Sequence, residues 1–236
     1  MALRGYGIDG IIRAMNVSVS LFSGRIRPLP ASGRPSGIYK QALTSTIAID
    51  SNGFVGDEQA DLRVHGGPEK AIHLYPAGHY AKLAAAFPEC AAALVAGSMG
   101  ENISTPALDE HQVRIGDVWR LGSARLQVCQ PRNPCWKIDD KFCCDGMAAY
   151  IAEHRLTGWY WRVLTRGVAA PGDKLELETA AAAPTLAEAM DLAAAHRPSL
   201  AALQALADLP GLASQWRTKI INRLAWLKTH ATDGST

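Results

Sequence analysis

The sequence predicts a mainly β domain with some helix, in the form of a β-barrel or a strongly coiled sheet, followed by a small C-terminal three-helix bundle. Short runs rich in β-branched and aromatic residues recur over most of the chain, separated by glycine and proline turns. Many short strands with few helices favour a barrel or coiled sheet over a parallel α/β fold. After an alanine run at Ala180–Pro184 the apolar spacing becomes helical, which predicts the bundle.

We expect the strands to form one domain, residues 17–179, after an N-terminal extension of residues 1–16. Apolar residues at helical spacing predict two helices inside this domain, Ala77–Phe87 and Met147–Leu156. The predicted strands are Val17–Phe22, Ile47–Ile49, Val113–Ile115, Val118–Leu121, Ala124–Cys129, Trp159–Leu164 and Lys174–Leu177.

Residues 180–236 are expected to be a linker followed by three helices. Thr185 and Glu188 have the spacing of a capping box, which opens a helix running to about His196. Pro198-Ser199 opens a second helix, and Pro210-Gly211 ends it. The third carries an apolar stripe formed by Trp216, Ile220, Leu224 and Leu227. Such a bundle is marginal alone, so we expect it to dock on the main domain.

The composition is that of a soluble globular protein, with 48% hydrophobic and 19% charged residues. A formal net charge of +2 gives no electrostatic argument for nucleic acid as a partner. No apolar run is long enough to span a membrane, and residues 1–15 are a poor secretory signal. Met15 is an alternative start to Met1. Five cysteines, an odd number, are expected to be reduced thiols in a cytoplasmic protein.

Cys135 is the residue most suited to chemistry. It follows a predicted strand, and Pro134 favours an extended conformation for Asn133. Arg132 and Lys137 place positive charge near the sulfur, which lowers a thiol pKa and favours the thiolate. A thiolate is both a nucleophile and a soft metal ligand. From chemistry alone, a buried unreactive cysteine is the more common case.

The other cysteines are weaker candidates. Cys90 lies in an alanine-rich helical stretch and is expected in the core, and Cys129 ends a strand. Adjacent Cys143 and Cys144 have poor geometry for a disulfide or for sharing a metal ion. Because no Cys-x-x-Cys is present, a structural zinc site has little support.

Polar turns at predicted strand ends suggest a pocket for a small anionic or heterocyclic ligand. Gly66 and Gly67, after His65, allow backbone amides to approach an anion, and Lys70 adds charge. The turns at Gly56–Gln59 and Gly100–Asn102 carry acids and amides of the kind that recognise a pterin. Each is also compatible with ordinary turn chemistry. The spacing of His65, His73 and His79 does not favour a joint metal site.

Together these segments resemble the MOSC domain, the family related to the C-terminal part of molybdenum cofactor sulfurases. The matching segments are GDEQAD (56–61), HGGPEKAIHLYP (65–76), GENIST (100–105), IGDVWRLGSARLQV (115–128) and QPRNPCWKI (130–138). The resemblance covers about residues 17–179, and residues 180–236 resemble the helical extension of the YiiM-like subgroup.

The resemblance implies a MOSC fold that binds the molybdenum cofactor, molybdopterin with its metal, with the thiolate of Cys135 ligating molybdenum. Asn102 matches an asparagine of the cofactor pocket, and Arg132 and Asn133 lie in the ligand loop. The other cofactor-pocket candidates implied are His65, Gly66, Gly67, Lys70 and Glu101. Pterin contacts that mitochondrial relatives obtain from an amino-terminal extension are expected here from Lys40, Arg25 or the helical tail.

The implied activity is reduction of N-hydroxylated compounds, such as hydroxylamino base analogues and amidoximes, in a detoxifying role. Glu101, Asp57 and His65 are alternative proton donors. Because the chain has no convincing G-x-G-x-x-G fingerprint, electrons are expected from a separate carrier such as a flavodoxin, a ferredoxin or a flavin reductase.

Three alternatives stay open. Cys135 could carry a persulfide, or the protein could store and deliver the cofactor. The last helix could bind nucleic acid through Arg217, Lys219, Arg223 and Lys228, although such charges usually form a solvated face. We also expect the apolar stripe of this helix to face the main domain, leaving Arg217 and Arg223 in solvent for an acidic electron carrier.

Overall fold

The computed structural model describes residues 15–62 and 65–230, and a nine-stranded sheet forms its centre. The strand order is β1-β14-β10-β11-β12-β8-β9-β2-β5, with β8 and β9 parallel and the other pairs antiparallel. Its strands are β1 (Asn16–Ser18), β2 (Ser20–Ser23), β5 (Gln41–Ala42), β8 (Ile72–Pro76), β9 (Ile103–Thr105), β10 (Val118–Leu121), β11 (Ala124–Pro131), β12 (Trp159–Thr165) and β14 (Lys174–Thr179). The described strands form an open, coiled sheet and no closed barrel, so of the two predicted forms the coiled sheet is confirmed.

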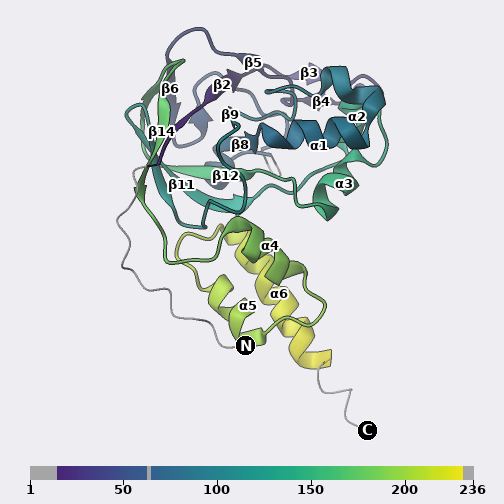
Figure 1. Ribbon diagram of the computed structural model, residues 1–236, viewed down its shortest axis with the longest axis vertical. Helices are drawn as coiled ribbons and strands as arrows, with labels where there is room; N and C mark the ends of the chain where they lie inside the picture. The colour runs from purple at the N-terminus through teal and green to yellow at the C-terminus, as the bar shows by residue number, and fades with distance from the viewer. Residues whose placement is uncertain (1–14, 63–64, 231–236) are drawn as a thin grey trace.

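Smaller elements complete the sheet-rich part. A three-stranded sheet joins β13 (Gly167–Ala169), β6 (Ile47–Asp50) and β7 (Gly53–Phe54), and β3 (Arg27–Pro28) pairs with β4 (Pro35–Ser36). Helices α1 (Gly78–Ala86), α2 (Lys137–Phe142) and α3 (Met147–Glu153) lie together on one side of the sheet, as Figure 1 shows. The short 3-10 helices are η1 (Pro68–Lys70) and η2 (Pro88–Ala93).

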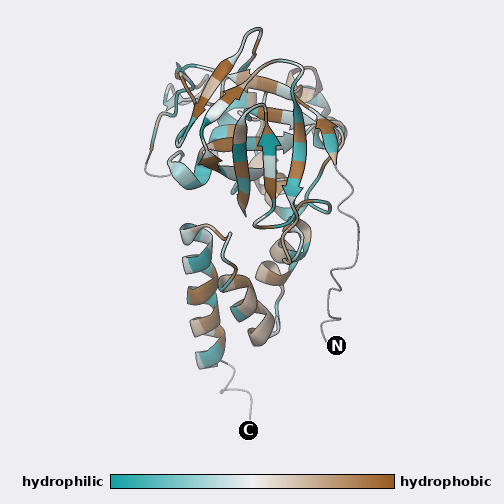
Figure 2. Ribbon diagram, turned by 90° about the vertical axis from the view of Figure 1, so that its left-hand side faces the viewer, coloured by the Kyte–Doolittle hydropathy of each residue, from teal (hydrophilic) through white to brown (hydrophobic). Residues whose placement is uncertain are grey.

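The main core is built on alternation along the strands, because successive side chains point to opposite faces. In β12, Trp159 and Trp161 are fully buried, whereas Tyr160 between them faces the other side of the sheet. Figure 2 shows this alternation of hydrophobic and hydrophilic residues along the strands. A second core lies beneath α1, η2, α2 and α3 and includes Leu83, Met99 and Ile138.

The three predicted C-terminal helices are α4 (Leu186–Ala194), α5 (Leu200–Ala207) and α6 (Ser214–His230), and they lie below the sheet (Figure 1). The capping box is confirmed: the Thr185 hydroxyl accepts from the Glu188 amide at 3.2 Å, and the Glu188 carboxylate accepts from the Thr185 amide at 2.8 Å. Apolar residues of the bundle, including Leu186, Leu203 and Trp216, belong to the same core as the sheet, so the bundle packs on the sheet.

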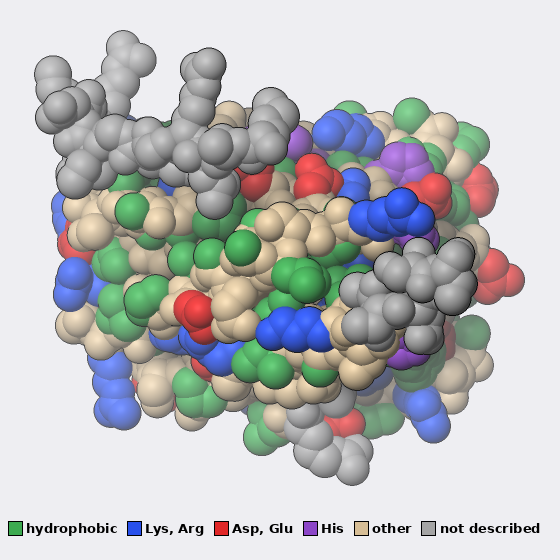
Figure 3. Space-filling view, turned by 90° about the horizontal axis from the view of Figure 1, so that it is seen from below, with side chains coloured by type: hydrophobic (Ala, Val, Ile, Leu, Met, Phe, Trp, Pro, Cys, Tyr) green, Lys and Arg blue, Asp and Glu red, His purple; other side chains and the backbone are tan. Residues whose placement is uncertain are grey.

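The expectation that Arg217 and Arg223 are left for solvent is wrong. The Arg217 guanidinium donates to the carbonyl oxygens of Ala207, the last residue of α5, and of Leu209. Arg223 donates to the carbonyl oxygen of Ala195, immediately after α4. Helix C-termini leave carbonyls without partners inside the helix, and these arginines supply the missing donors. On the part of the lower face that Figure 3 shows, the basic side chains of the described residues are scattered and do not gather in one patch.

One predicted strand is wrong. Val113–Ile115 forms no strand, and only Arg114 makes an isolated bridge, to Thr185. Asp117 closes a turn here, because its carboxylate accepts from the Arg114 amide at 2.8 Å and its amide donates to the Arg114 carbonyl. The predicted strand Val17–Phe22 is divided into β1 and β2 at Val19. In the part of the chain that the structure describes, no helix is both long and apolar enough to cross a membrane.

Candidate active site

A polar pocket gathers most of the site residues that the sequence predicts. It encloses about 620 Å³, part of which is open to solvent. The loops before β5, after β7, before η1, before β9 and after β11 form its walls. The predicted residues that line it are Lys40, Asp57, His65, Gly66, Lys70, Asn102, Arg132 and Cys135.

The floor of the pocket is a buried network around Asp57. Its carboxylate accepts from the Lys40 ammonium at 2.5 and 2.6 Å, and from the Asn102 side-chain amide at 3.0 Å. The backbone amide of Gly24 adds a fourth contact at 2.7 Å. The Asn102 side chain also joins two strands, because its oxygen accepts from the amide of His73 in β8 and its nitrogen donates to the Phe22 carbonyl in β2. This network holds loops far apart in sequence together.

Cys135 lies at the pocket wall, two residues before the start of α2, and its side chain is partly exposed. Its sulfur lies 3.9 Å from Nε2 of His65, which belongs to the loop before η1. Burial lowers the pKa of His65 to about 4, and the charges of Lys137, Arg132 and Lys70 add to this. The imidazole is therefore neutral near pH 7, and its Nε2 can donate to the sulfur or accept from it according to the tautomer.

Basic side chains give the pocket its electrostatic character. Burial is the main cause of the lowered pKa of His65, of His73 and of Lys141, and the charge of Arg132 adds to all three shifts. Lys70 and Lys137 line the same pocket, and Lys137 donates to the Pro35 carbonyl at 3.2 Å. A concentration of positive charge in a half-enclosed cleft favours an anionic ligand such as a phosphate.

The loop before η1 requires glycine. Gly66 and Gly67 have φ angles of 140° and 83°, which side-chain-bearing residues rarely adopt. A Cβ on Gly66 would also lie 2.6 Å from the Gln59 side chain. The two glycines therefore let the backbone between His65 and Lys70 pass close beside the pocket.

The sequence did not identify one wall of the pocket. His73 of β8 and Tyr160 of β12 are paired across the sheet, and their ring centroids are 5.2 Å apart. Burial holds the pKa of His73 well below its usual value and raises that of Tyr160. Both rings are neutral and are tilted by 44° to one another, so they form an uncharged aromatic wall of the pocket beside Arg132. The signal that could have found Tyr160 is the alternation in Trp159–Trp161, which places it on the face opposite the core.

Three predicted site residues do not line the pocket. The Glu101 carboxylate is fully buried and accepts from the Tyr80 hydroxyl and the Gly97 amide at 2.6 Å and from the Met99 amide at 3.1 Å. Burial raises the pKa of Glu101, and these hydrogen bonds oppose the shift. Asn133 and Gly67 instead line adjoining depressions that also include Gln215 of α6, so the helical tail reaches the rim.

Arg25 lies outside the pocket, where its guanidinium pairs with Glu58 at 2.8 Å. Among the described residues, His65, His73 and His79 form no joint metal site. Nε2 of His79 lies 2.8 Å from the Glu110 carboxylate, away from the pocket, whereas His73 is part of the pocket wall.

Comparison with known proteins identifies the family. A model of the MOSC domain matches residues 61–176. The chain is 37% identical over 179 residues to the protein YiiM of Escherichia coli, covering 76% of this chain and 80% of that protein. It is 33% identical over 163 residues to a reductase of Gibberella moniliformis, covering 68% of this chain and 29% of that protein.

Comparison with solved structures identifies the same family. The crystal structure of YiiM from Escherichia coli matches with a TM-score of 0.76 at 28% identity, covering 89% of this chain and 93% of that one. YiiM from Geobacillus stearothermophilus matches with a TM-score of 0.73 at 27% identity, covering 89% of this chain and all of that one. This chain therefore belongs to the MOSC family, as a YiiM-like member.

Proposed function

We propose that this protein is a molybdenum-cofactor-dependent reductase of N-hydroxylated compounds. The observation that carries the proposal is the partly exposed thiol of Cys135 in the wall of a basic pocket, in a chain of the MOSC family, whose domains generally bind the molybdenum cofactor. That the matched Gibberella protein is named a reductase supports redox chemistry. Substrates of this class are small molecules such as amidoximes and hydroxylamino base analogues.

The residues present fit such a cofactor. A thiolate is a suitable ligand for a soft metal, and Cys135 is the thiol that lines the pocket. Arg132, Lys70 and Lys137 supply charge for the phosphate, and the backbone around Gly66 and Gly67 can approach it closely. The neutral aromatic rings of His73 and Tyr160 offer apolar contacts for the edge or face of a heterocycle. Asn133 and Lys40 remain candidates for further polar contacts.

When bound, the cofactor would supply the two electrons that convert an N–OH group to an amine and water. The chain's own residues would orient the substrate and deliver protons. Of the three candidate donors, Asp57 is held in an ion pair with Lys40, and Glu101 is enclosed beneath the pocket. His65 both lines the pocket and lies beside the sulfur, and its ring is neutral near pH 7. We therefore assign to it a proton relay, in which one ring nitrogen accepts a proton as the other donates one to the substrate.

The electrons would come from a separate carrier protein of the flavodoxin, ferredoxin or flavin-reductase type. Because Arg217 and Arg223 bond carbonyl groups of the bundle, they are unsuited to be its docking site. Basic candidates for that docking site include Lys219 and Lys228, which are exposed on α6, and Lys137 at the pocket.

The test uses protein purified from a host that makes the cofactor, with molybdenum measured by elemental analysis and turnover measured with an amidoxime and a chemical reductant. Wild type and the control Cys143→Ser should contain stoichiometric molybdenum and turn over. Cys135→Ser should keep its fold and lose activity, because a serine hydroxyl is a harder and far less acidic ligand. Wild-type turnover by Cys135→Ser would disprove the assignment. Sulfane sulfur on Cys135 in metal-free wild type would identify a persulfide carrier instead.

A further inference from the structure

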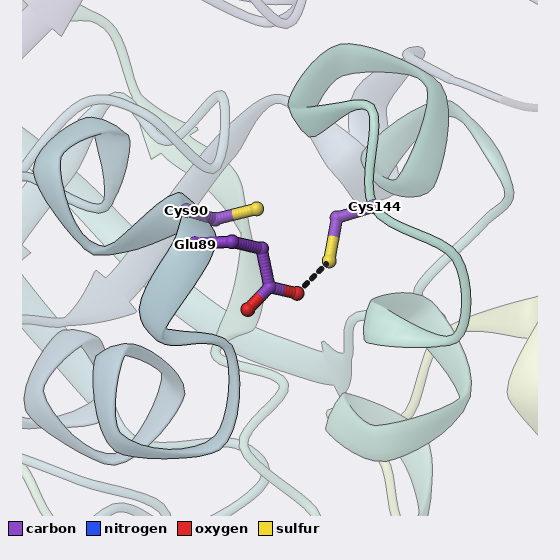
Figure 4. A group of neighbouring side chains, drawn as sticks. All are labelled: Glu89, Cys90 and Cys144. Atoms are coloured by element: carbon purple, nitrogen blue, oxygen red, sulfur yellow. Dashed lines mark hydrogen bonds between the residues drawn. The ribbon is translucent and has the colours of Figure 1, made fainter.

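A second group of metal-ligating side chains lies outside the pocket. Glu89 and Cys90 of η2 and Cys144 after α2 place one carboxylate oxygen and two sulfur atoms within 4.8 Å of one another (Figure 4). The Cys144 thiol donates to the Glu89 carboxylate at 3.2 Å. The cluster joins two segments that are distant in sequence, and among the described residues no other group of His, Cys, Asp and Glu comes together in this way.

The backbone fixes where the Cys144 sulfur points. Cys143, at the end of α2, has a φ angle of 50°, in the left-handed region that a side-chain-bearing residue seldom adopts. The Cys144 amide then donates to the Asp139 carbonyl at 3.0 Å, which closes the helix end. This turn separates the two adjacent cysteines: Cys143 is exposed, and Cys144 is buried and turned toward η2. Two neighbouring thiols therefore have different surroundings.

Two sulfurs and a carboxylate are the donor set of a thiophilic divalent ion, of which zinc is the most common in proteins. Cys90 and Cys144 are 6% and 7% exposed, so an ion between them would be shielded, while the exposed Glu89 leaves a route from solvent. Binding of a divalent cation would displace the protons of the two thiols.

We propose that Glu89, Cys90 and Cys144 form a binding site for one Zn²⁺ ion, with a water molecule as the fourth ligand. The ion ties η2 to the loop between α2 and α3. Both segments cover the second core, which also contains Ile38 and Met99 from the wall of the pocket. Binding therefore stabilises the layer on which α2, and Cys135 before it, are placed. The proposal does not depend on the proposed activity.

The experiment is a titration of the full chain, reduced and freed of metal, with Co²⁺ as a spectroscopic substitute for Zn²⁺. Because Cys135 and His65 could also take up a metal ion, the titration is made in a Cys135→Ser background. One equivalent of Co²⁺ should bind with a thiolate-to-cobalt charge-transfer band, and Zn²⁺ should displace it. Adding Cys90→Ser or Cys144→Ser should remove the band and weaken affinity by about 100-fold or more. Adding Glu89→Gln should weaken it roughly tenfold.

Cys143→Ser is the matched control, since it changes the adjacent thiol and should leave stoichiometry and spectrum unchanged. Zn²⁺ should also raise the melting temperature of the Cys135→Ser protein and leave that of the Cys135→Ser/Cys144→Ser protein unchanged. The proposal is overturned if the reduced Cys135→Ser protein takes up no Co²⁺, or if Cys144→Ser binds as well as its parent. A Cys90–Cys144 disulfide that reforms in air with Zn²⁺ present would also overturn it.

Discussion

Lys40 and Asp57 form a buried ion pair at the floor of the pocket, with side chains that are 4% and 2% exposed. The ammonium lies 2.5 and 2.6 Å from the two carboxylate oxygens. A buried charge is costly unless it is paired and hydrogen-bonded, and here the carboxylate has further donors from Gly24 and Asn102. The pair therefore holds together the loops that form the floor of the pocket.

Removing one partner of this pair should strongly destabilise the fold. Lys40→Met and Asp57→Asn should each lower the free energy of unfolding by about 3–5 kcal/mol, because either change leaves a buried group without its partner. Urea denaturation measures both, and the double variant should lose clearly less than the sum of the two. The exposed pair of Arg25 and Glu58 gives a control, since Arg25→Ala should cost less than about 1 kcal/mol. Additive losses in the double variant would show that the pair is not coupled.

Arg132 and Asn102 should behave differently when each is changed to alanine. The Asn102 side chain is fully engaged by His73, Phe22 and Asp57, so Asn102→Ala should lower stability by about 1–3 kcal/mol. Arg132 faces the pocket as its central charge, so Arg132→Ala should leave the fold nearly as stable and purify with less pterin. Denaturation curves and pterin fluorescence after stringent washing measure the two effects. Equal pterin content in wild type and Arg132→Ala would remove Arg132 from the site.

The sequence predicted elements correctly where the structure depends only on neighbouring residues. Val118–Leu121 has the bounds of β10, and the Thr185–Glu188 capping box begins α4 at the expected residue. Val113–Ile115 has the composition of a strand, but the Asp117 side chain closes a turn on Arg114, and composition does not reveal such a turn. The roles of Arg217 and Arg223 also depend on which helix ends lie beside α6, which is a tertiary relationship.

The same division holds for the site. Cys135, Arg132 and the Gly66–Lys70 loop could be predicted because their residue types and neighbours have intrinsic chemistry. Alternation in Trp159–Trp161 could have placed Tyr160 on the face opposite the core, but the wall that it forms with His73 comes from the pairing of β8 with β12. The grouping of Cys90 with Cys144 could not be predicted either. They are separated by 53 residues and lie in segments that share no motif, and only the folded chain brings their sulfur atoms together.

The contribution of Lys141 to the free energy of unfolding should become more favourable as the pH rises from about 8 to about 10.5. Burial lowers its pKa from the ordinary 10.5 to about 8, with the charges of Arg132 and Lys40 contributing and Glu101 opposing. The unfolded chain therefore binds more protons in this window, and stability rises as both states lose the charge. The free energy of unfolding of wild type minus that of Lys141→Met should grow by about 2–3 kcal/mol across it. If the difference in free energy of unfolding between wild type and Lys141→Met does not change with pH, burial does not lower the pKa of Lys141.

Arg217 should stabilise the bundle as a cap on the end of α5. Its guanidinium donates to the carbonyls of Ala207, Leu209 and Leu212, so Arg217→Ala should lower the free energy of unfolding by about 1–3 kcal/mol. Lys219→Ala, an exposed change on the same helix, should stay within about 0.5 kcal/mol of wild type. Denaturation followed by tryptophan fluorescence suits the measurement because Trp216 is buried in the core that α6 shares with the sheet. Equal stability of the two variants would mean that these carbonyls need no cap. Charge reversal at Arg217 would therefore confound any test of electron-carrier docking, and Lys219→Glu with Lys228→Glu makes the better test.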